Sequence, residues 1–241
     1  MDAMFEELDY QITPLGALIL RRRKVPQLGD RIVYEVLLNR EFLMSSLFHR
    51  VEDALAELGL AAVPGSDLEV AVGGLGLGYT AWTALQSERV ASLLVIEYLQ
   101  PVIEWHRNGM VPLGQRLMAD ARTRSIEADF FNRAEDPAAG LDPEQPGRRF
   151  HAVLLDIDHT PQHWLNPRHA AFYGETGLQR MRQHLHPGGV FAMWADGPID
   201  PGFRDLLASV FSDARAHEIP FDNPLTGGTS TGTVYVGNVA P

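Results

Sequence analysis

Short, continuously apolar segments alternate with longer amphipathic ones from residue 68 onward. This pattern predicts strands at 68–72, 92–96, 150–155 and 190–194, and helices at about 79–88, 98–109, 170–185 and 201–212. Strands that are apolar along their whole length and alternate with helices are typical of a parallel sheet covered on both faces. Segments 214–220 and 233–236 follow one another without a helix, which predicts an antiparallel hairpin at one edge of this sheet.

The first 44 residues have a different pattern. Apolar runs at 17–20 and 31–38 flank the sequence QLGD at 27–30, which has the chemistry of a turn. We therefore expect a small antiparallel β unit over residues 1–44 and a Rossmann-like α/β domain over residues 45–241.

A helix is expected where these two units join. Apolar side chains recur there at helical spacing, at Leu47, Val51, Ala54, Leu55 and Leu58. Ser45 and Ser46 are predicted to cap the amino end of this helix, and Gly59 is predicted to end it.

A glycine-rich segment, GGLGLG at 73–78, follows the first strand of the predicted sheet and precedes a helix. Its glycines are Gly73, Gly74, Gly76 and Gly78. Glycine permits a tight turn and lets backbone N–H groups approach a ligand closely, and this strand-to-helix context is the one that a nucleoside-binding loop requires. The segment lacks the Gly-Lys-Ser/Thr ending of a Walker A motif, whereas the loop by itself also permits a nicotinamide dinucleotide.

Two carboxylates follow at the ends of the next strands. Glu97 ends the second strand, at the offset where a carboxylate accepts hydrogen bonds from both ribose hydroxyls. We favour this role over that of a solvated glutamate at a strand end. Asp129 follows the next short strand, and two interpretations stay open: it binds an adenine amino group, or it caps the helix that follows.

The segment after the strand at 150–155 carries the candidate catalytic residues Asp156, Asp158 and His159. Ligands of open α/β sheets bind outside the carboxyl ends of the strands, and a carboxylate or an imidazole placed there can accept a proton. For Asp158 and His159 the alternative is capping of the next turn. Together with His163, which follows closely, His159 and the two aspartates could also form a metal site. Such a cluster of polar residues is more typical of a polar loop, so we expect no metal.

The sequence LHPGGV at 185–190 combines a predicted helix end, a Pro-Gly-Gly turn and an apolar strand. Together with the glycine-rich segment, it resembles the class I S-adenosylmethionine-dependent methyltransferase fold. Within that fold the chain most resembles the spermidine synthase (polyamine aminopropyltransferase) family. The shared features are a β-rich start, Gly73-Gly74 after a strand, Glu97, Asp129 and Asp156. The resemblance covers most of the chain.

This resemblance implies transfer of an aminopropyl group from decarboxylated S-adenosylmethionine, a co-substrate, to a small polyamine-like amine. In the synthases the acidic residue that ends this strand helps to deprotonate the attacking amine, and Asp156 matches that position. The chemistry requires such a group, because a protonated amine cannot attack until it loses a proton. Members of the family are commonly dimers, so a homodimer is one option for this chain.

Three positions depart from the family pattern. Gly76 stands where the synthases have an acidic residue within the glycine string, and His159-Thr160 stand where they have a second Asp-Pro pair. Leu43 or Met44 replaces a glutamine that precedes the first long helix. The alternatives are therefore methyl transfer from S-adenosylmethionine itself to an unknown acceptor, and a non-catalytic protein of this fold. A nicotinamide-dependent oxidoreductase is a weaker alternative.

Composition narrows the setting of this chemistry. A chain of 241 residues suits one α/β domain with a small appendage, and the lack of cysteine excludes disulfides, thiolate metal sites and cysteine nucleophiles. The net charge of −11 opposes binding to nucleic acid. No apolar run can span a bilayer, and the acidic start MDAMFEE is unlike a signal peptide. We expect a cytoplasmic enzyme without a membrane or nucleic-acid partner.

Overall fold

The computed structural model describes residues 5–241. Residues 1–4 lie outside the described residues. They are the first part of the acidic segment MDAMFEE, on which the prediction about a signal peptide depends. Among the helices that are described, none is long and apolar enough to cross a bilayer.

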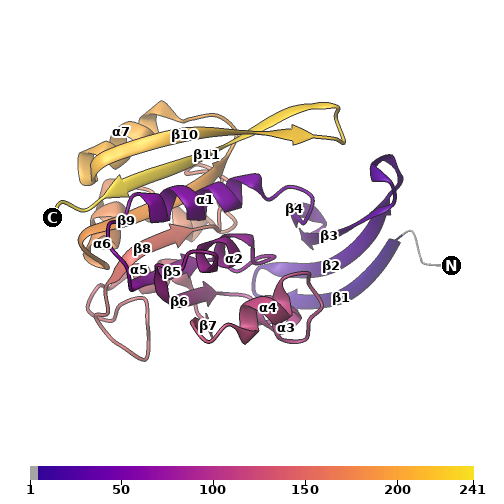
Figure 1. Cartoon of the computed structure of the whole chain (residues 1–241), viewed down its shortest axis with the longest axis horizontal. Helices are drawn as coiled ribbons and strands as arrows, with labels where there is room; N and C mark the ends of the chain where they lie inside the picture. Colours follow the sequence, from indigo (N-terminus) through magenta and orange to yellow (C-terminus); the bar gives the residue numbers. More distant parts are fainter. Residues whose placement is uncertain (1–4) are drawn as a thin grey trace.

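Seven strands form the central sheet (Figure 1): β5 (Leu68–Gly73), β6 (Val90–Glu97), β7 (Thr123–Glu127), β8 (Phe150–Leu155), β9 (Leu185–Asp196), β10 (Ser212–Asn223) and β11 (Gly228–Asn238). They lie in the order β10-β11-β9-β8-β5-β6-β7. The strands β5 to β9 are parallel, whereas β11 pairs antiparallel with β9 and with β10. This confirms the predicted parallel sheet with an antiparallel hairpin at one edge. The direction of winding changes between β5 and β8, and ligands bind at such switch points.

Helices cover both faces of this sheet: α1 (Arg50–Ala61), α2 (Tyr79–Leu85), α3 (Gln100–Arg107), α4 (Gly114–Ala119), α5 (Phe130–Glu135), α6 (Glu175–Gln183) and α7 (Pro201–Val210). The first four pack on one face and the last three on the other. Side chains alternate along the buried strands, so Val70 and Val72 join the apolar cluster under α1–α3 while Ala71 joins the one under α5–α7.

The N-terminal unit is a four-stranded antiparallel sheet of β1 (Phe5–Thr13), β2 (Gly16–Val25), β3 (Arg31–Leu38) and β4 (Glu41–Ser45). In Figure 1 it lies on the side toward which the arrowheads of β6 and β8 point. Leu18 and Val36 on its inner face belong to the same apolar cluster as α1. Asp9 also accepts a hydrogen bond from the indole of Trp105 on α3 at 2.6 Å, so both apolar and polar contacts join the N-terminal sheet to the helices of the α/β domain.

The start of α1 differs from the prediction. Ser45 is the last residue of β4, and the Ser46 hydroxyl accepts the Tyr34 backbone N–H at 2.9 Å. The helix begins only at Arg50, without a side-chain cap, so the predicted serine cap is wrong. Gly59 does not end the helix either but lies within it, where a Cβ would be only 2.5 Å from Leu154 Cδ2 and glycine therefore lets α1 pack closely on β8.

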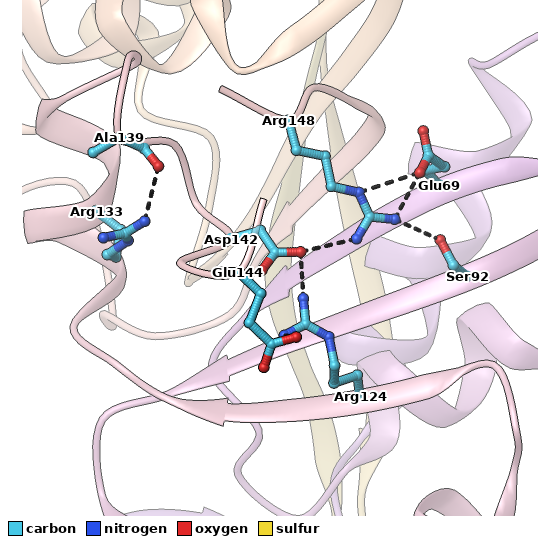
Figure 2. Close-up of polar contacts among 8 residues, drawn as sticks. All are labelled: Glu69, Ser92, Arg124, Arg133, Ala139, Asp142, Glu144 and Arg148. Carbon is cyan, nitrogen blue, oxygen red and sulfur yellow. Dashed lines mark hydrogen bonds and ion pairs between the residues drawn. The ribbon is translucent and has the colours of Figure 1, made fainter. Parts of the chain in front are cut away.

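A polar cluster holds the long connection between α5 and β8 against the sheet (Figure 2). The fully buried Asp142 carboxylate pairs with Arg124, and it accepts a bond from Arg148 Nη1 at 3.0 Å. Arg148 also reaches Glu69 on β5 at 2.6 Å and Ser92 on β6 at 2.9 Å. The cluster therefore joins this connection to the amino-terminal parts of two neighbouring strands.

Candidate functional site

A cavity of about 320 Å³ opens at the carboxyl ends of the parallel strands. Seven of the predicted site residues line it: Gly74, Gly76, Gly78, Glu97, Asp129, Asp156 and His159. They come from the loops that follow β5, β6, β7 and β8, which are neighbours in the sheet. The fold thus gathers residues that lie up to 85 positions apart in sequence at one edge of the sheet.

The glycine-rich segment forms the floor beside β5. Gly74 has a φ of +93°, and a Cβ there would lie 2.0 Å from the Asp156 carbonyl oxygen, so only glycine fits. Gly73 lies outside the cavity lining and accepts the Asp156 backbone N–H at 2.7 Å through its carbonyl oxygen. These contacts fix the loops after β5 and β8 against each other.

Glu97 is buried at the end of β6 and faces the glycine-rich segment. Its Oε2 accepts the Leu75 backbone N–H and its Oε1 accepts the Leu99 backbone N–H, both at 2.8 Å. Burial raises the pKa of Glu97, and donation from Leu99 and Leu75 opposes that shift. The backbone N–H groups of Gly76 and Tyr98 oppose the shift as well, so the backbone on both sides holds the orientation of this carboxylate, which lines the cavity.

Asp129 takes the capping role that the sequence left open. Its Oδ1 accepts the Asn132 backbone N–H at 3.1 Å at the amino end of α5, which confirms the helix cap. Within residues 5–241, Oδ2 has no hydrogen-bond partner, and the side chain also lines the cavity. The cap therefore leaves one carboxylate oxygen for a ligand.

Asp156 and Glu52 form a carboxyl pair at the switch point. Asp156 accepts the Thr80 hydroxyl at 2.6 Å, and burial raises its pKa to about 6, with the charge of Glu97 adding to the shift and Thr80 opposing it. Burial raises the pKa of Glu52 to about 8, and the charge of Asp156 contributes. Around neutral pH the two carboxyl groups therefore share one proton.

Glu52 is a lining residue that sequence reasoning missed. It lies three and four positions before the buried Leu55 and Ala56, on the inward face of α1. A carboxylate on the apolar side of an amphipathic helix is the signal that points to it, because such a group is seldom buried without a role.

His159 and Asp158 have different surroundings. His159 lines the cavity with its ring 5.0 Å from that of His163, and burial, followed by the proximity of His163, lowers its pKa. Asp158 lies outside the cavity lining. Its carboxylate is occupied by His169 Nδ1, the Tyr173 hydroxyl and a backbone N–H, so the structure does not bring it together with the other predicted catalytic residues.

The remaining wall of the cavity is apolar. Four apolar side chains line it from the N-terminal sheet, the segment before α1, β9 and β10, respectively: Met44, Phe48, Trp194 and Phe221. The Met44 sulfur lies 2.9 Å from the place that a Cβ on Gly76 would occupy. Two departures from the family pattern, at 44 and 76, are therefore in contact, and the methionine fills the space of the missing side chain.

One group of possible metal ligands, Glu69, His151 and His186, is present in the described part of the chain. His151 Nδ1 already accepts the Glu69 backbone N–H at 3.0 Å, and the Glu69 carboxylate pairs with Arg148 (Figure 2). The three residues lie at the starts of β5, β8 and β9, at the opposite end of the strands from the cavity. His159 and His163 do not belong to this group.

Comparison with solved structures identifies the class of this fold. No protein-family model matches the sequence, and no curated protein matches it. A crystal structure of spermidine synthase in complex with the transition state analogue AdoDATO matches with a TM-score of 0.72 and 16% identity, over 96% of this chain and 73% of that one. Spermidine synthase from Thermotoga maritima matches with a TM-score of 0.70 and 15% identity, over 96% of this chain and 72% of that one.

The fold is therefore a methyltransferase-like α/β fold, with a mainly parallel seven-stranded sheet and a small antiparallel N-terminal sheet. Within that class it is the fold of the spermidine synthases. Both fold-level predictions from the sequence are confirmed.

Proposed function

We propose that this protein transfers an aminopropyl group from decarboxylated S-adenosylmethionine to a small polyamine-like amine. The observation that carries the proposal is that one cavity holds two kinds of acidic group, on either side of the glycine-rich segment. Glu97 is a carboxylate placed to bind a ribose, and Asp156 and Glu52 form a carboxyl pair. One side suits the nucleoside of a sulfonium donor, and the other suits the amine that attacks it.

The reaction needs few protein groups. The amine nitrogen forms a bond to the carbon next to the sulfonium sulfur, the carbon–sulfur bond breaks, and the thioether leaves without protonation. The proton that the amine loses goes to the Asp156 carboxylate, which is ionised above its raised pKa of about 6. Alignment of donor and acceptor in the cavity supplies much of the remaining rate enhancement.

The charges of the cavity favour the decarboxylated donor over S-adenosylmethionine itself. The Glu52–Asp156 pair, which keeps one negative charge, and Asp196 line it together with Glu97 and Asp129. Arg50 is the one arginine or lysine in the described lining, and it pairs with Glu57 at 2.9 Å. The ammonium and sulfonium groups of the decarboxylated donor match this field, whereas the α-carboxylate of S-adenosylmethionine is repelled by it.

The test is incubation of the protein and putrescine with each donor, followed by mass spectrometry. We expect methylthioadenosine from decarboxylated S-adenosylmethionine and no turnover of S-adenosylmethionine. The variant Asp156→Asn should still bind the donor and lose about 10²–10⁴-fold in turnover. S-adenosylhomocysteine as the product would instead establish methyl transfer. Gly76 favours that alternative, because the synthases have an acidic residue at this position and here Met44 fills the space of its side chain.

A matched binding experiment separates an inactive protein from a wrong pocket. Calorimetry with methylthioadenosine should give heat that Glu97→Ala abolishes and Asp156→Asn retains. Binding without turnover of either donor would identify a non-catalytic protein of this fold. Absence of any heat that depends on Glu97 would refute the nucleoside site.

A further inference from the structure

A buried cluster behind the cavity wall holds one histidine in a defined state. Asp158 Oδ1 accepts the Leu165 backbone N–H at 2.7 Å, and Oδ2 accepts the Tyr173 hydroxyl at 2.9 Å. His169 Nδ1 lies 3.0 Å from Oδ1 and 2.9 Å from Oδ2. Burial raises the pKa of Tyr173 well above its ordinary value, so this hydroxyl keeps its proton and donates.

This arrangement sets the tautomer of His169. A carboxylate only accepts, so the nitrogen that faces both of its oxygens must carry hydrogen. In the neutral ring the other nitrogen, Nε2, is then an acceptor. Nε2 has no hydrogen-bond partner among residues 5–241, and His169 lines the cavity although only 8% of it is exposed.

His169 lies at the end of the cavity where a nucleobase would be. Its ring stacks on Phe131 with 3.8 Å between centroids, and Phe131 follows Asp129 by two positions. Asp129 follows β7, the strand next to β6, which ends in the proposed ribose ligand Glu97. A base attached to a ribose at Glu97 can extend toward β7, where Asp129 and His169 both line the cavity.

We propose that His169, oriented by Asp158, selects the nucleobase of the donor by accepting a hydrogen bond from an exocyclic amino group. This inference rests on the proposed function, whose nucleoside site it refines. The adenine amino group offers two hydrogens, which match the free oxygen of Asp129 and Nε2 of His169. A 6-keto base presents an oxygen acceptor to the same two acceptors, which leaves buried polar groups unpaired.

Asp158 is in this view a positioning residue rather than a catalytic one. Replacement by asparagine retains its shape and can retain the Leu165 bond through the amide oxygen. The amide NH₂ then faces His169 Nδ1, which becomes the acceptor, so Nε2 carries the hydrogen. The variant should therefore donate at the position where the wild type accepts, and a residue with a purely structural role would not reverse selectivity in this way.

The experiment is calorimetric titration of the full chain with methylthioadenosine and with its 6-keto analogue methylthioinosine. We expect the wild type to favour the adenine compound by about 10-fold or more. Asp158→Asn should lose or invert that preference, and His169→Phe, which keeps the stacking on Phe131, should weaken only the adenine compound. Tyr173→Phe is the matched control, because it touches Asp158 without changing the tautomer, and it should keep the preference.

The outcomes distinguish this inference from the proposed function. A wild type that binds both nucleosides equally, or an Asp158→Asn protein that binds with unchanged preference, overturns the role of His169 and leaves the proposed function intact. A wild type that binds neither nucleoside overturns both. Circular dichroism of each variant checks its folding, and if Asp158→Asn does not fold, the wild-type preference and the His169→Phe result decide.

Discussion

At the scale of single residues, Asp156 has two features that suit a general base: it lies half-buried at a switch point of the sheet, and one hydroxyl donates a hydrogen bond to it. Since burial raises its pKa to about 6, the fraction able to accept a proton falls as the pH drops through 6. We expect kcat/KM for the amine to fall tenfold per pH unit below that point. A pH–rate profile in which activity stays constant from pH 7 to pH 5 would contradict this.

The Thr80 hydroxyl gives a second prediction for the same group. Its hydrogen bond to Asp156 Oδ2, at 2.6 Å, stabilises the ionised form and lowers the pKa. Thr80→Val should therefore raise the pKa of Asp156 and move the acid limb of the pH–rate profile toward neutral pH. Thr83→Val on the same helix is the control, because Thr83 donates to Asp53, which does not line the cavity. A limb that does not move would exclude Asp156 as its origin.

The location of two site residues could be predicted from sequence, because their position along a strand was sufficient. Glu97 ends the mainly apolar strand β6 and Asp156 directly follows β8, and the carboxyl ends of parallel strands meet at one edge. Glu52 and His169 were missed because their place in the cavity depends on how a helix and a loop pack against that edge, and no local pattern encodes this packing. Asp158 was expected to be catalytic, but its contacts with His169 and Tyr173 become visible only in three dimensions.

At the scale of elements, Gly59 sets how closely α1 approaches the sheet. A Cβ there would lie 2.5 Å from Leu154 Cδ2 and 3.3 Å from Ala192 Cβ. Gly59→Val should lower the free energy of unfolding by about 1–3 kcal/mol despite the better helix propensity of valine. Ala61→Val, at an exposed position of the same helix, is the control and should change it by less than about 0.5 kcal/mol. Urea unfolding measures both variants.

The steric origin of that cost can be checked with a double variant. Leu154→Ala alone should destabilise the protein by about 2–5 kcal/mol because it leaves a cavity. In the Gly59→Val protein the same change should cost less, since the valine occupies part of the vacated space. Strict additivity of the two effects would show that the contact between α1 and β8 does not cause them.

The connection between α5 and β8 depends on Asp142. Burial acts to raise the pKa of this carboxyl, but donation from Arg124 and Arg148 outweighs it, so the pKa is lowered. A lowered pKa contributes stability that is complete above the ordinary value of about 4 and is lost as the pH falls through the folded-state value. Asp142→Asn should therefore cost on the order of 3 kcal/mol at pH 7 and progressively less below about pH 4.

Urea unfolding of the wild type and of Asp142→Asn, at pH 7 and below about pH 4, measures how the cost of this substitution changes with pH. Asp205→Asn is the control, because Asp205 forms an exposed ion pair with Arg204 at 2.7 Å, and such pairs contribute about 0–1 kcal/mol. If the two variants were equally stable at pH 7, Asp142 would not anchor the connection.

Elements were predicted best where periodicity decides them. The buried strands have continuous apolar runs, and β8 was placed over its full length, Phe150–Leu155. The N-terminal sheet has two more strands than the two apolar runs indicated, because β1 and β4 carry mostly polar or exposed side chains. The start of α1 was misplaced since Ser45 and Ser46 have side chains that suit a helix cap and a strand edge equally well.

At the scale of the whole molecule, the N-terminal sheet forms part of the wall of the cavity. Leu18 and Val36 belong to the main apolar cluster and also line the cavity with Met44. Alternating apolar and polar positions along a strand predict that one face of this sheet is buried, but they do not identify what it covers. That relation is set by the path of the chain from Ser45 into α1.

The net charge of −11 and the carboxylates of the cavity act together on a cationic acceptor. Their field should attract the amine over a distance comparable with the Debye length, which falls from about 30 Å at 0.01 M salt to about 3 Å at 1 M. We expect kcat/KM for putrescine to fall several-fold across that range. The affinity for methylthioadenosine, which is uncharged, should stay nearly constant and serves as the control. If salt lowered kcat/KM for putrescine and the affinity for methylthioadenosine equally, it would act on the structure of the protein rather than on its electrostatic field. The charge-based preference for a cationic acceptor would then be wrong.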